Sequence, residues 1–199
     1  IGAVLMAHKL FIYLGALTVV IFGWHVWSLR ILSIVAGAVL VWVLNRHLRS
    51  SATDQSGLTW RLGCLFLLLT PLDFRYINLY RPEILQAACG FASYHWLTRF
   101  LATDRRRDLV IGAVFAGISH LVHLNGLLFI GAGIVLLWFC GKRRSLLIFV
   151  PLSLALAGLY FWDIVGHWTL FQLQLHENPA LHPSATAWYR PFASLIDEH

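Results

Sequence analysis

The chain has 199 residues, of which 59% are hydrophobic and only 12% are charged, with a net charge of +6. Soluble domains are about 45–50% apolar and about 25% charged, so this composition excludes an ordinary soluble domain and indicates a chain that lies mostly in lipid. The positive charge would suggest a nucleic-acid partner in a soluble protein. Here it lies in short connections between apolar runs, where it sets orientation and meets anionic lipid, so we expect no nucleic acid.

Seven apolar runs follow one another along the chain. The first, 10–23, is shorter than the about 20 residues of a typical span, so we predict a juxtamembrane or half-inserted helix on the outer face, although a crossing is geometrically feasible. The other six are predicted to span the membrane: 30–48, 57–72, 83–101, 109–123, 125–140 and 146–165. The fold class is therefore all-α, a polytopic transmembrane helical bundle of about six spans plus one juxtamembrane helix.

Basic residues gather in three clusters, and two apolar runs separate each cluster from the next. The clusters are Arg46, His47 and Arg49; Arg99 with Arg105, Arg106 and Arg107; and Lys142, Arg143 and Arg144. If every run crosses the bilayer, all three clusters fall on one face, which the positive-inside rule identifies as the cytoplasmic face. The opposite face is then expected to carry the chemistry.

The chain divides into two predicted parts, and both of its ends are interpreted as cut. Residues 1–165 form a membrane module, and the polar tail 166–199 is an outer loop that begins a further region. No signal peptide precedes the apolar part. The three cysteines show no paired spacing and are interpreted as core residues: Cys64, Cys89 and Cys140.

The predicted outer loop 70–83 holds the densest set of functional side chains. One guanidinium group can donate two parallel hydrogen bonds to a phosphate, and aromatic rings stack on sugars. This set of side chains therefore suits a sugar phosphate. A structural interpretation stays open, because Pro82 followed by Glu83 also opens a helix and the tyrosines suit a membrane interface. The candidates are Arg75, Tyr76, Tyr80, Arg81 and Glu83.

Further candidates lie on either side of this loop. His8 and Lys9 precede the short outer helix, where a lysine binds lipid phosphate or simply extends to headgroups. His120 and His123 share one helical face before a break at Asn125-Gly126. Two histidines are weak evidence for a metal, so we interpret them as a polar cavity lining and name no metal ligand. A second histidine-containing set lies in the tail and is equally unproven: His167, His176, His182 and Glu177.

The order of these motifs resembles the integral-membrane GT-C glycosyltransferases of the dolichyl-phosphate-mannose–protein mannosyltransferase type, including the bacterial lipid A aminoarabinose transferase. The resemblance covers residues 8–165. It rests on His8-Lys9-Leu10-Phe11, Phe22-Gly23, Ser28-Leu29-Arg30-Ile31-Leu32-Ser33, Leu69-Thr70-Pro71, Arg75-Tyr76, Arg81-Pro82-Glu83-Ile84-Leu85, Gly112, Gly117 and His120-Leu121-Val122-His123-Leu124-Asn125-Gly126-Leu127. The two prolines that the family carries after His8 are replaced by Lys9 and Leu10.

The resemblance implies transfer of a sugar from a polyprenyl-phosphate donor to a protein, lipid or glycan acceptor at the periplasmic or luminal face, by inverting displacement. It implies a catalytic acidic residue upstream of Ile1, so this segment alone is expected to be inactive. Lys9, Arg75, Arg81 and Arg30 are the expected phosphate binders. No cofactor is certain, and a divalent metal stays open. Short loops favour the bacterial inner membrane over the endoplasmic reticulum.

Two other functions remain as alternatives. A transporter or channel segment would line its substrate path with the membrane arginines and histidines. Such a protein should show inverted repeats and broken helices at mid-membrane, whereas the sequence has one candidate break, near a span end. A membrane scaffold subunit is the third interpretation.

Overall fold

The structure is a computed structural model that describes residues 9–51, 81–169 and 172. In these ranges every regular element is a helix, which confirms the predicted all-α class. The predicted span 57–72 lies outside the described residues. The elements are α2 (Lys9–Phe22), α3 (Val26–Ser51), α6 (Pro82–Thr103), α7 (Arg106–Val122), the 3-10 helix η1 (Leu124–Gly126), α8 (Leu127–Phe139), the 3-10 helix η2 (Arg143–Ser145) and α9 (Leu146–Gly166).

Within the described residues the predicted helix positions are confirmed, with small shifts at the ends. α3 begins four residues before the predicted start at Arg30, and α7 begins at Arg106 where the sequence suggested a basic loop. Arginine is a good helix former, and Asp108 in the first turn of α7 interacts favourably with the positive end of the helix dipole. Part of the basic run therefore forms the first turn of α7.

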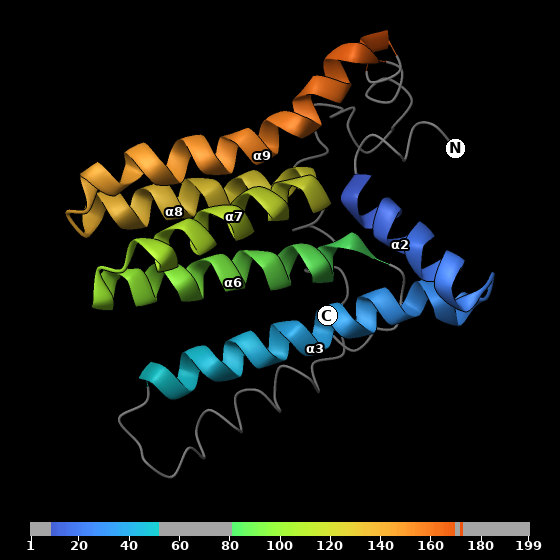
Figure 1. Ribbon diagram of the computed structural model, residues 1–199, viewed down its shortest axis with the longest axis horizontal. Coiled ribbons are helices and arrows are strands. Elements are labelled where there is room, and N and C mark those ends of the chain that lie inside the picture. Colours follow the sequence, from blue (N-terminus) through green and yellow to red (C-terminus); the bar gives the residue numbers. More distant parts are fainter. Residues whose placement is uncertain (1–8, 52–80, 170–171, 173–199) are drawn as a thin grey trace, which may run out of the picture.

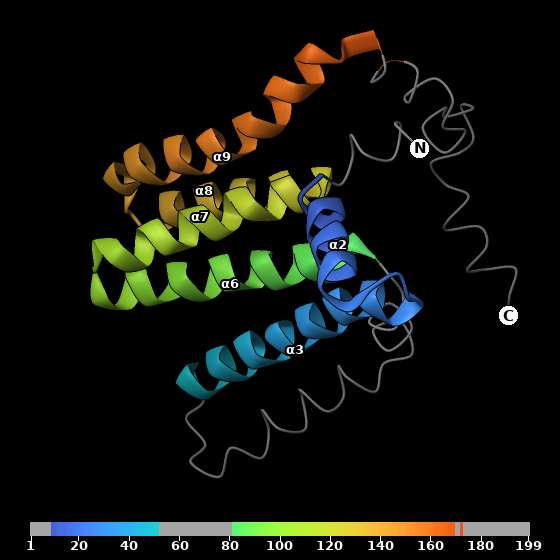
Figure 2. The same ribbon diagram turned by 45° about the vertical axis from the view of Figure 1, so that its right-hand side comes forward.

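Five helices run along one another and α2 crosses them at one end, as Figures 1 and 2 show. α7 is central, with contacts to α6, α8, α9 and α2, while α3 packs against α6 and α2. Because α6, α7, α8 and α9 follow one another through short connections, neighbouring helices alternate in direction. This alternation brings the C-terminal ends of α3, α6 and α8 together with the starts of α7 and α9.

That shared end carries all three basic clusters, and we call it the basic end. Its cations are Arg46, Arg49, Arg99, Arg105, Arg106, Arg107, Lys142, Arg143 and Arg144. The opposite end, which we call the site end, contains the starts of α3, α6 and α8 and the last turns of α7 and α9. The predicted gathering of the basic clusters on one side is therefore confirmed.

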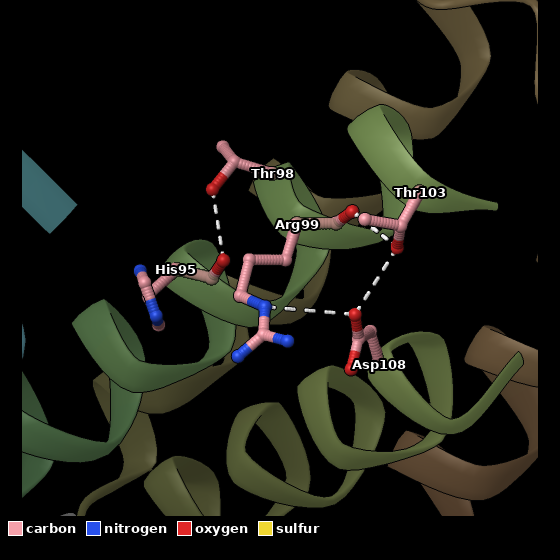
Figure 3. A network of polar contacts seen from close by, with 5 residues as sticks. All are labelled: His95, Thr98, Arg99, Thr103 and Asp108. Atoms are coloured by element: carbon pink, nitrogen blue, oxygen red, sulfur yellow. Dashed lines mark hydrogen bonds and ion pairs between the residues drawn. The ribbon is translucent and has the colours of Figure 1, made fainter. Parts of the chain in front are cut away.

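A polar network ties α6 to α7 at the basic end (Figure 3). The side chain of Asp108 is almost fully buried; its Oδ2 lies 3.6 Å from Nε of Arg99 and accepts a hydrogen bond of 3.2 Å from the Thr103 hydroxyl. Arg99 also lies over the Trp96 ring at 4.5 Å. A buried carboxylate is costly unless it is paired and hydrogen-bonded, so these partners are what allow Asp108 to sit inside the bundle.

Small residues let the helices approach closely in the core. A Cβ on Gly117 of α7 would lie 2.9 Å from the carbonyl oxygen of Ser153 on α9. The Ser153 hydroxyl in turn donates to the carbonyl oxygen of Ala113 at 3.1 Å. Glycine, alanine and serine at helix contacts are typical of membrane bundles, where packing replaces the hydrophobic effect between helices.

Large apolar side chains cover the outside of the described helices. Exposures of 83% for Trp24, Phe139 and Trp162 would be costly in water. One helical stretch in the described part, Val26–His47, is both long and apolar enough to cross a membrane, while Lys9–Phe22 and Leu124–Phe139 are apolar but shorter. The number of six spans stays a prediction.

Candidate functional site

Arg81 and Glu83 stand at the start of α6. Arg81 is the extended residue just before the helix, and Pro82 occupies its first turn, as the sequence predicted. Nη1 of Arg81 lies 3.5 Å from Oε1 of Glu83, and the two side chains are 50% and 45% exposed. About half of each side chain of this ion pair therefore faces the surroundings of the site.

The backbone of Arg81 is fixed against α3. Its N–H donates to Oγ of Ser33 at 3.3 Å, and Ser33 is fully buried. Arg30 precedes Ser33 by three residues, so both lie on the same side of α3. The guanidinium of Arg30 lies 5.5 Å from the Trp27 ring. The contact with Ser33 thus brings Arg81 beside the helical turn that carries Arg30.

His120 lies in the last turn of α7 and His123 directly after the helix, so the prediction that both share one helical face is wrong. α7 ends at Val122, and His123 is extended. Nδ1 of His123 accepts a hydrogen bond of 3.1 Å from the backbone N–H of Asn125 and so caps η1, which begins at Leu124. His120 is fully buried, with Nδ1 3.1 Å from the carbonyl oxygen of Leu124 and its ring stacked on Phe161 at 5.6 Å. The predicted break at this point is confirmed.

Gly126 makes this reversal of the chain sterically feasible. A Cβ at this position would lie 2.3–2.4 Å from backbone atoms of Ser119 and His120. No side chain can be accommodated at such distances, and backbone atoms cannot swing aside. The chain therefore folds back onto the end of α7 only with glycine here, and this holds both histidines in place.

A second contact joins the first turns of α6 to the end of α7. The Ser119 hydroxyl donates to the carbonyl oxygen of Gln86 at 3.2 Å. Glu83 lies one turn before Gln86, and its carboxylate interacts electrostatically with His123. The structure thereby brings Glu83 and His123 to the same region, although they are 40 positions apart in the printed sequence.

Lys9 opens α2, which packs against α3 and α7. Its side chain is half-buried, and burial lowers the pKa of the ammonium group because the charged form loses solvation. A partly desolvated ammonium interacts more strongly with an anion than one in bulk water does. This property suits the phosphate-binding role that the sequence suggested.

The structure brings some of the predicted site residues together, and their roles stay predictions. Arg81, Glu83, His123 and the turn of α3 bearing Arg30 meet at the site end, His120 lies buried behind His123, and Lys9 belongs to the helix packed across this end. The remaining candidates lie outside the described residues: His8, Arg75, Tyr76 and Tyr80. Within the described ranges, no three histidine, cysteine or acidic side chains gather as metal ligands would.

Two buried hydroxyl groups at this end were not singled out from the sequence. Ser33 fixes Arg81, and Ser119 holds the end of α7 to α6. Both are serines within apolar stretches. Polar side chains at such positions are expensive in lipid unless they bond to a neighbouring helix. A serine within a predicted span therefore indicates a hydrogen bond to a neighbouring helix, and this signal could have identified both residues from the sequence.

Comparison with known proteins gives one match. The family model described as dolichyl-phosphate-mannose-protein mannosyltransferase matches residues 9–168, a range that includes every described helix. Searches of curated proteins and of solved structures found no match.

Proposed function

This chain belongs to the dolichyl-phosphate-mannose-protein mannosyltransferase family, and we propose that it transfers a sugar from a polyprenyl-phosphate-linked donor to an acceptor at the outer face of the membrane. The family consists of membrane glycosyltransferases that use lipid-linked sugar donors. We place the protein in the bacterial inner membrane, with its site end toward the periplasm.

The observation that carries this proposal is the separation of charges along the bundle. The basic clusters occupy one end, while Arg81, Glu83 and His123 meet at the other. Cytoplasmic loops of membrane proteins are enriched in lysine and arginine, so the basic end corresponds to the cytoplasm. The site end then faces the periplasm, where we expect a lipid-linked sugar, in place of a nucleotide sugar, to be the donor substrate.

The proposed reaction is a direct displacement with inversion. A carboxylate takes the proton of the acceptor hydroxyl as its oxygen attacks the anomeric carbon, and the bond from that carbon to the phosphate oxygen breaks. The polyprenyl phosphate leaves with both bonding electrons. We expect this base to be an acidic residue, as in the family pattern.

The developing charge on the leaving phosphate requires cations, and the site end supplies them. We assign this role to Lys9, Arg81 and Arg75, the last of which lies outside the described residues, with Arg30 in support. Preorganised charges in a poorly hydrated site stabilise a leaving group without rearranging at the moment of reaction. Partial burial of Lys9 and the half-exposed fork of Arg81 suit this task. His8, Tyr76, Tyr80, Glu83, His120 and His123 are assigned to the sugar and acceptor cavity.

Donor binding tests this assignment independently of turnover. We would measure binding of a radiolabelled polyprenyl-phosphate sugar to detergent-solubilised protein, comparing Arg81→Ala and Lys9→Ala with Arg106→Ala at the basic end. A charge-assisted hydrogen bond is worth about 1.5–3 kcal/mol, so the first two variants should bind at least about tenfold more weakly. Arg106→Ala should bind as the parent does. Equal binding by all three variants would refute the site assignment.

The transporter alternative receives no support from the family match. One additional measurement separates the two functions. A transporter would move the labelled donor into sealed vesicles without changing it. The proposed enzyme, with its acceptor present, should release polyprenyl phosphate.

A further inference from the structure

We propose that the C-terminal half of α3 carries a binding site for an anionic phospholipid of the leaflet at the basic end, with the lipid phosphate held by Arg46 and Arg49. This site lies at the opposite end of the bundle from the proposed donor site. It is independent of sugar transfer.

The first observation is a polar cavity at the end of α3. Its volume is about 430 Å³, and its described lining consists of Trp42, Asn45, Arg46 and Arg49. Both arginines are exposed, and the guanidinium of Arg46 lies 5.4 Å from the Trp42 ring. Two guanidinium groups at the mouth of one cavity form a site of the kind that binds phosphate.

Two cations of the basic end form ion pairs with described carboxylates, whereas Arg46 is among those that do not. Lys142 is paired with Asp104 at 2.9 Å, and Arg99 is paired with Asp108 at 3.6 Å. In the described part of the chain, no carboxylate pairs with Arg46. Its charge is therefore not neutralised within those residues.

Asn45 supplies a second sign of an absent partner. Its Oδ1 is buried and has no hydrogen-bond partner among the described residues. Buried polar groups are normally satisfied, so a polar side chain of this kind beside the cavity favours a polar occupant over an apolar one. Rotation of the amide by half a turn presents its NH2 group, which can donate to a phosphate oxygen.

An apolar stripe leads from this cavity toward the middle of the bundle. Val35, Val39 and Trp42 are 55%, 43% and 56% exposed, and with Arg46 and Arg49 they recur every three or four residues, which places all five on one face of α3. Val35 and Val39 also line an apolar groove of about 180 Å³ between α3, α6 and α7. The face thus changes from apolar to cationic along its length.

The dimensions of the stripe match one lipid leaflet. At 1.5 Å per residue, Val35 and Arg46 are about 16 Å apart along the helix, close to half of the about 30 Å hydrocarbon core. An acyl chain can therefore lie on the valines and Trp42 while its phosphate reaches the arginines. A free phosphate would make no contact with the apolar stripe, so the stripe favours a lipid. Basic pockets on the cytoplasmic side of membrane helices also bind anionic lipid headgroups in other proteins.

Native mass spectrometry of the detergent-solubilised protein tests this site. Dioctanoyl phosphatidylglycerol and dioctanoyl phosphatidylcholine are titrated separately into the parent, an Arg46→Gln/Arg49→Gln variant, and an Arg106→Gln/Arg107→Gln variant. The two variants lose the same charge at the same end. We expect phosphatidylglycerol binding to weaken at least tenfold in the first and less than twofold in the second, with phosphatidylcholine binding weakly throughout.

Four outcomes would overturn the proposal. Equal weakening in both double variants would mean general attraction of the basic end for anions. Equal binding of the two lipids would remove the role of charge, and competition by millimolar inorganic phosphate would indicate a free-phosphate site. Absence of phosphatidylglycerol binding to the parent would mean that another segment or protein covers this face.

Thermal unfolding in neutral detergent checks that both variants fold. Arg46→Lys should bind phosphatidylglycerol with intermediate affinity, because lysine keeps the positive charge but lacks the two-pronged guanidinium group.

Discussion

The basic end and the site end of this bundle use similar residues in different surroundings. At the basic end, the carboxylate of Asp108 is 3% exposed and bonds to both Thr103 and Arg99. At the site end, Arg81 and Glu83 stand 3.5 Å apart with about half of each side chain exposed. The first pair joins two helices, whereas the second joins two residues at the start of one helix and is open to its surroundings. Burial, more than residue type, separates a structural ion pair from a candidate binding pair.

The largest expected effect comes from closing the space that the reversal at the site end requires. Gly126→Ala would place a methyl group 2.3 Å from the backbone of His120, where nothing can move aside. We expect a loss of about 3 kcal/mol or more in unfolding free energy, at or above the upper end for overpacked sites. Thermal unfolding in detergent measures this.

Gly131→Ala is the matched control, because no atom lies within 4 Å of its added Cβ. Alanine exceeds glycine in helix propensity by about 1 kcal/mol, so this variant should be as stable as the parent or more stable. Equal destabilisation by the two substitutions would contradict the tight reversal at Gly126.

Next in size is the removal of one buried charge at the basic end. Asp108→Asn keeps the shape of the side chain but loses the charged partner of Arg99, and we expect a cost of about 2 kcal/mol in unfolding free energy. Asp104→Asn removes the exposed partner of Lys142 and should cost less than about 0.5 kcal/mol. Asparagine also tolerates the left-handed backbone of Asp104, where φ is 55°. Similar costs for both variants would mean that burial does not distinguish the two pairs.

Much of this fold could be predicted from the sequence, because helix boundaries depend on local chemistry. Pro82 with Glu83 marked the start of α6, and Asn125-Gly126 marked the end of α7. The partners of Ser33 and Asp108 could not be predicted in this way. Their contacts join residues on different helices, and hydrophobic periodicity gives the face of a helix without naming the residue opposite.

The candidate site was predicted in kind and only partly in arrangement. Family motifs pointed to Lys9, Arg81 and His123, but motif order carries no distances. The proximity of Glu83 to His123 depends on the hydrogen bond from Ser119 to Gln86, which only the packing of α6 on α7 reveals. The hydrogen bond from the backbone of Arg81 to Ser33 likewise depends on the packing of the start of α6 against α3.

A smaller effect is expected from the cap that opens η1. His123→Ala removes the acceptor of the Asn125 N–H, and loss of a cap costs about 1 kcal/mol in unfolding free energy. Asparagine at this position offers a side-chain oxygen as an alternative acceptor, so His123→Asn should recover much of the stability. If donor binding stays weak in His123→Asn while stability returns, His123 contacts the sugar; equal recovery of both would assign it a purely structural role.

The smallest effect concerns pH. Because burial lowers the pKa of Lys9, its ammonium loses its proton at a lower pH than an exposed lysine would. Donor affinity should therefore fall as pH rises through that lowered pKa, and Lys9→Arg should abolish this fall by keeping the charge. Stability should move the other way, because the unfolded chain binds more protons in this range and folding gains as pH rises. Identical affinity profiles for the parent and Lys9→Arg would exclude Lys9 from phosphate binding.

The central claim is that the two ends of the bundle face opposite sides of a membrane, and cysteine labelling tests it most directly. The native cysteines are replaced by alanine, and single cysteines are introduced at His25 and Asn125 near the site end, and at Arg106 and Arg144 at the basic end, all of which are exposed. A membrane-impermeant maleimide should label the first pair from outside intact cells and the second pair only in inverted vesicles. Labelling of the His25 and Arg106 positions from the same side would contradict the account.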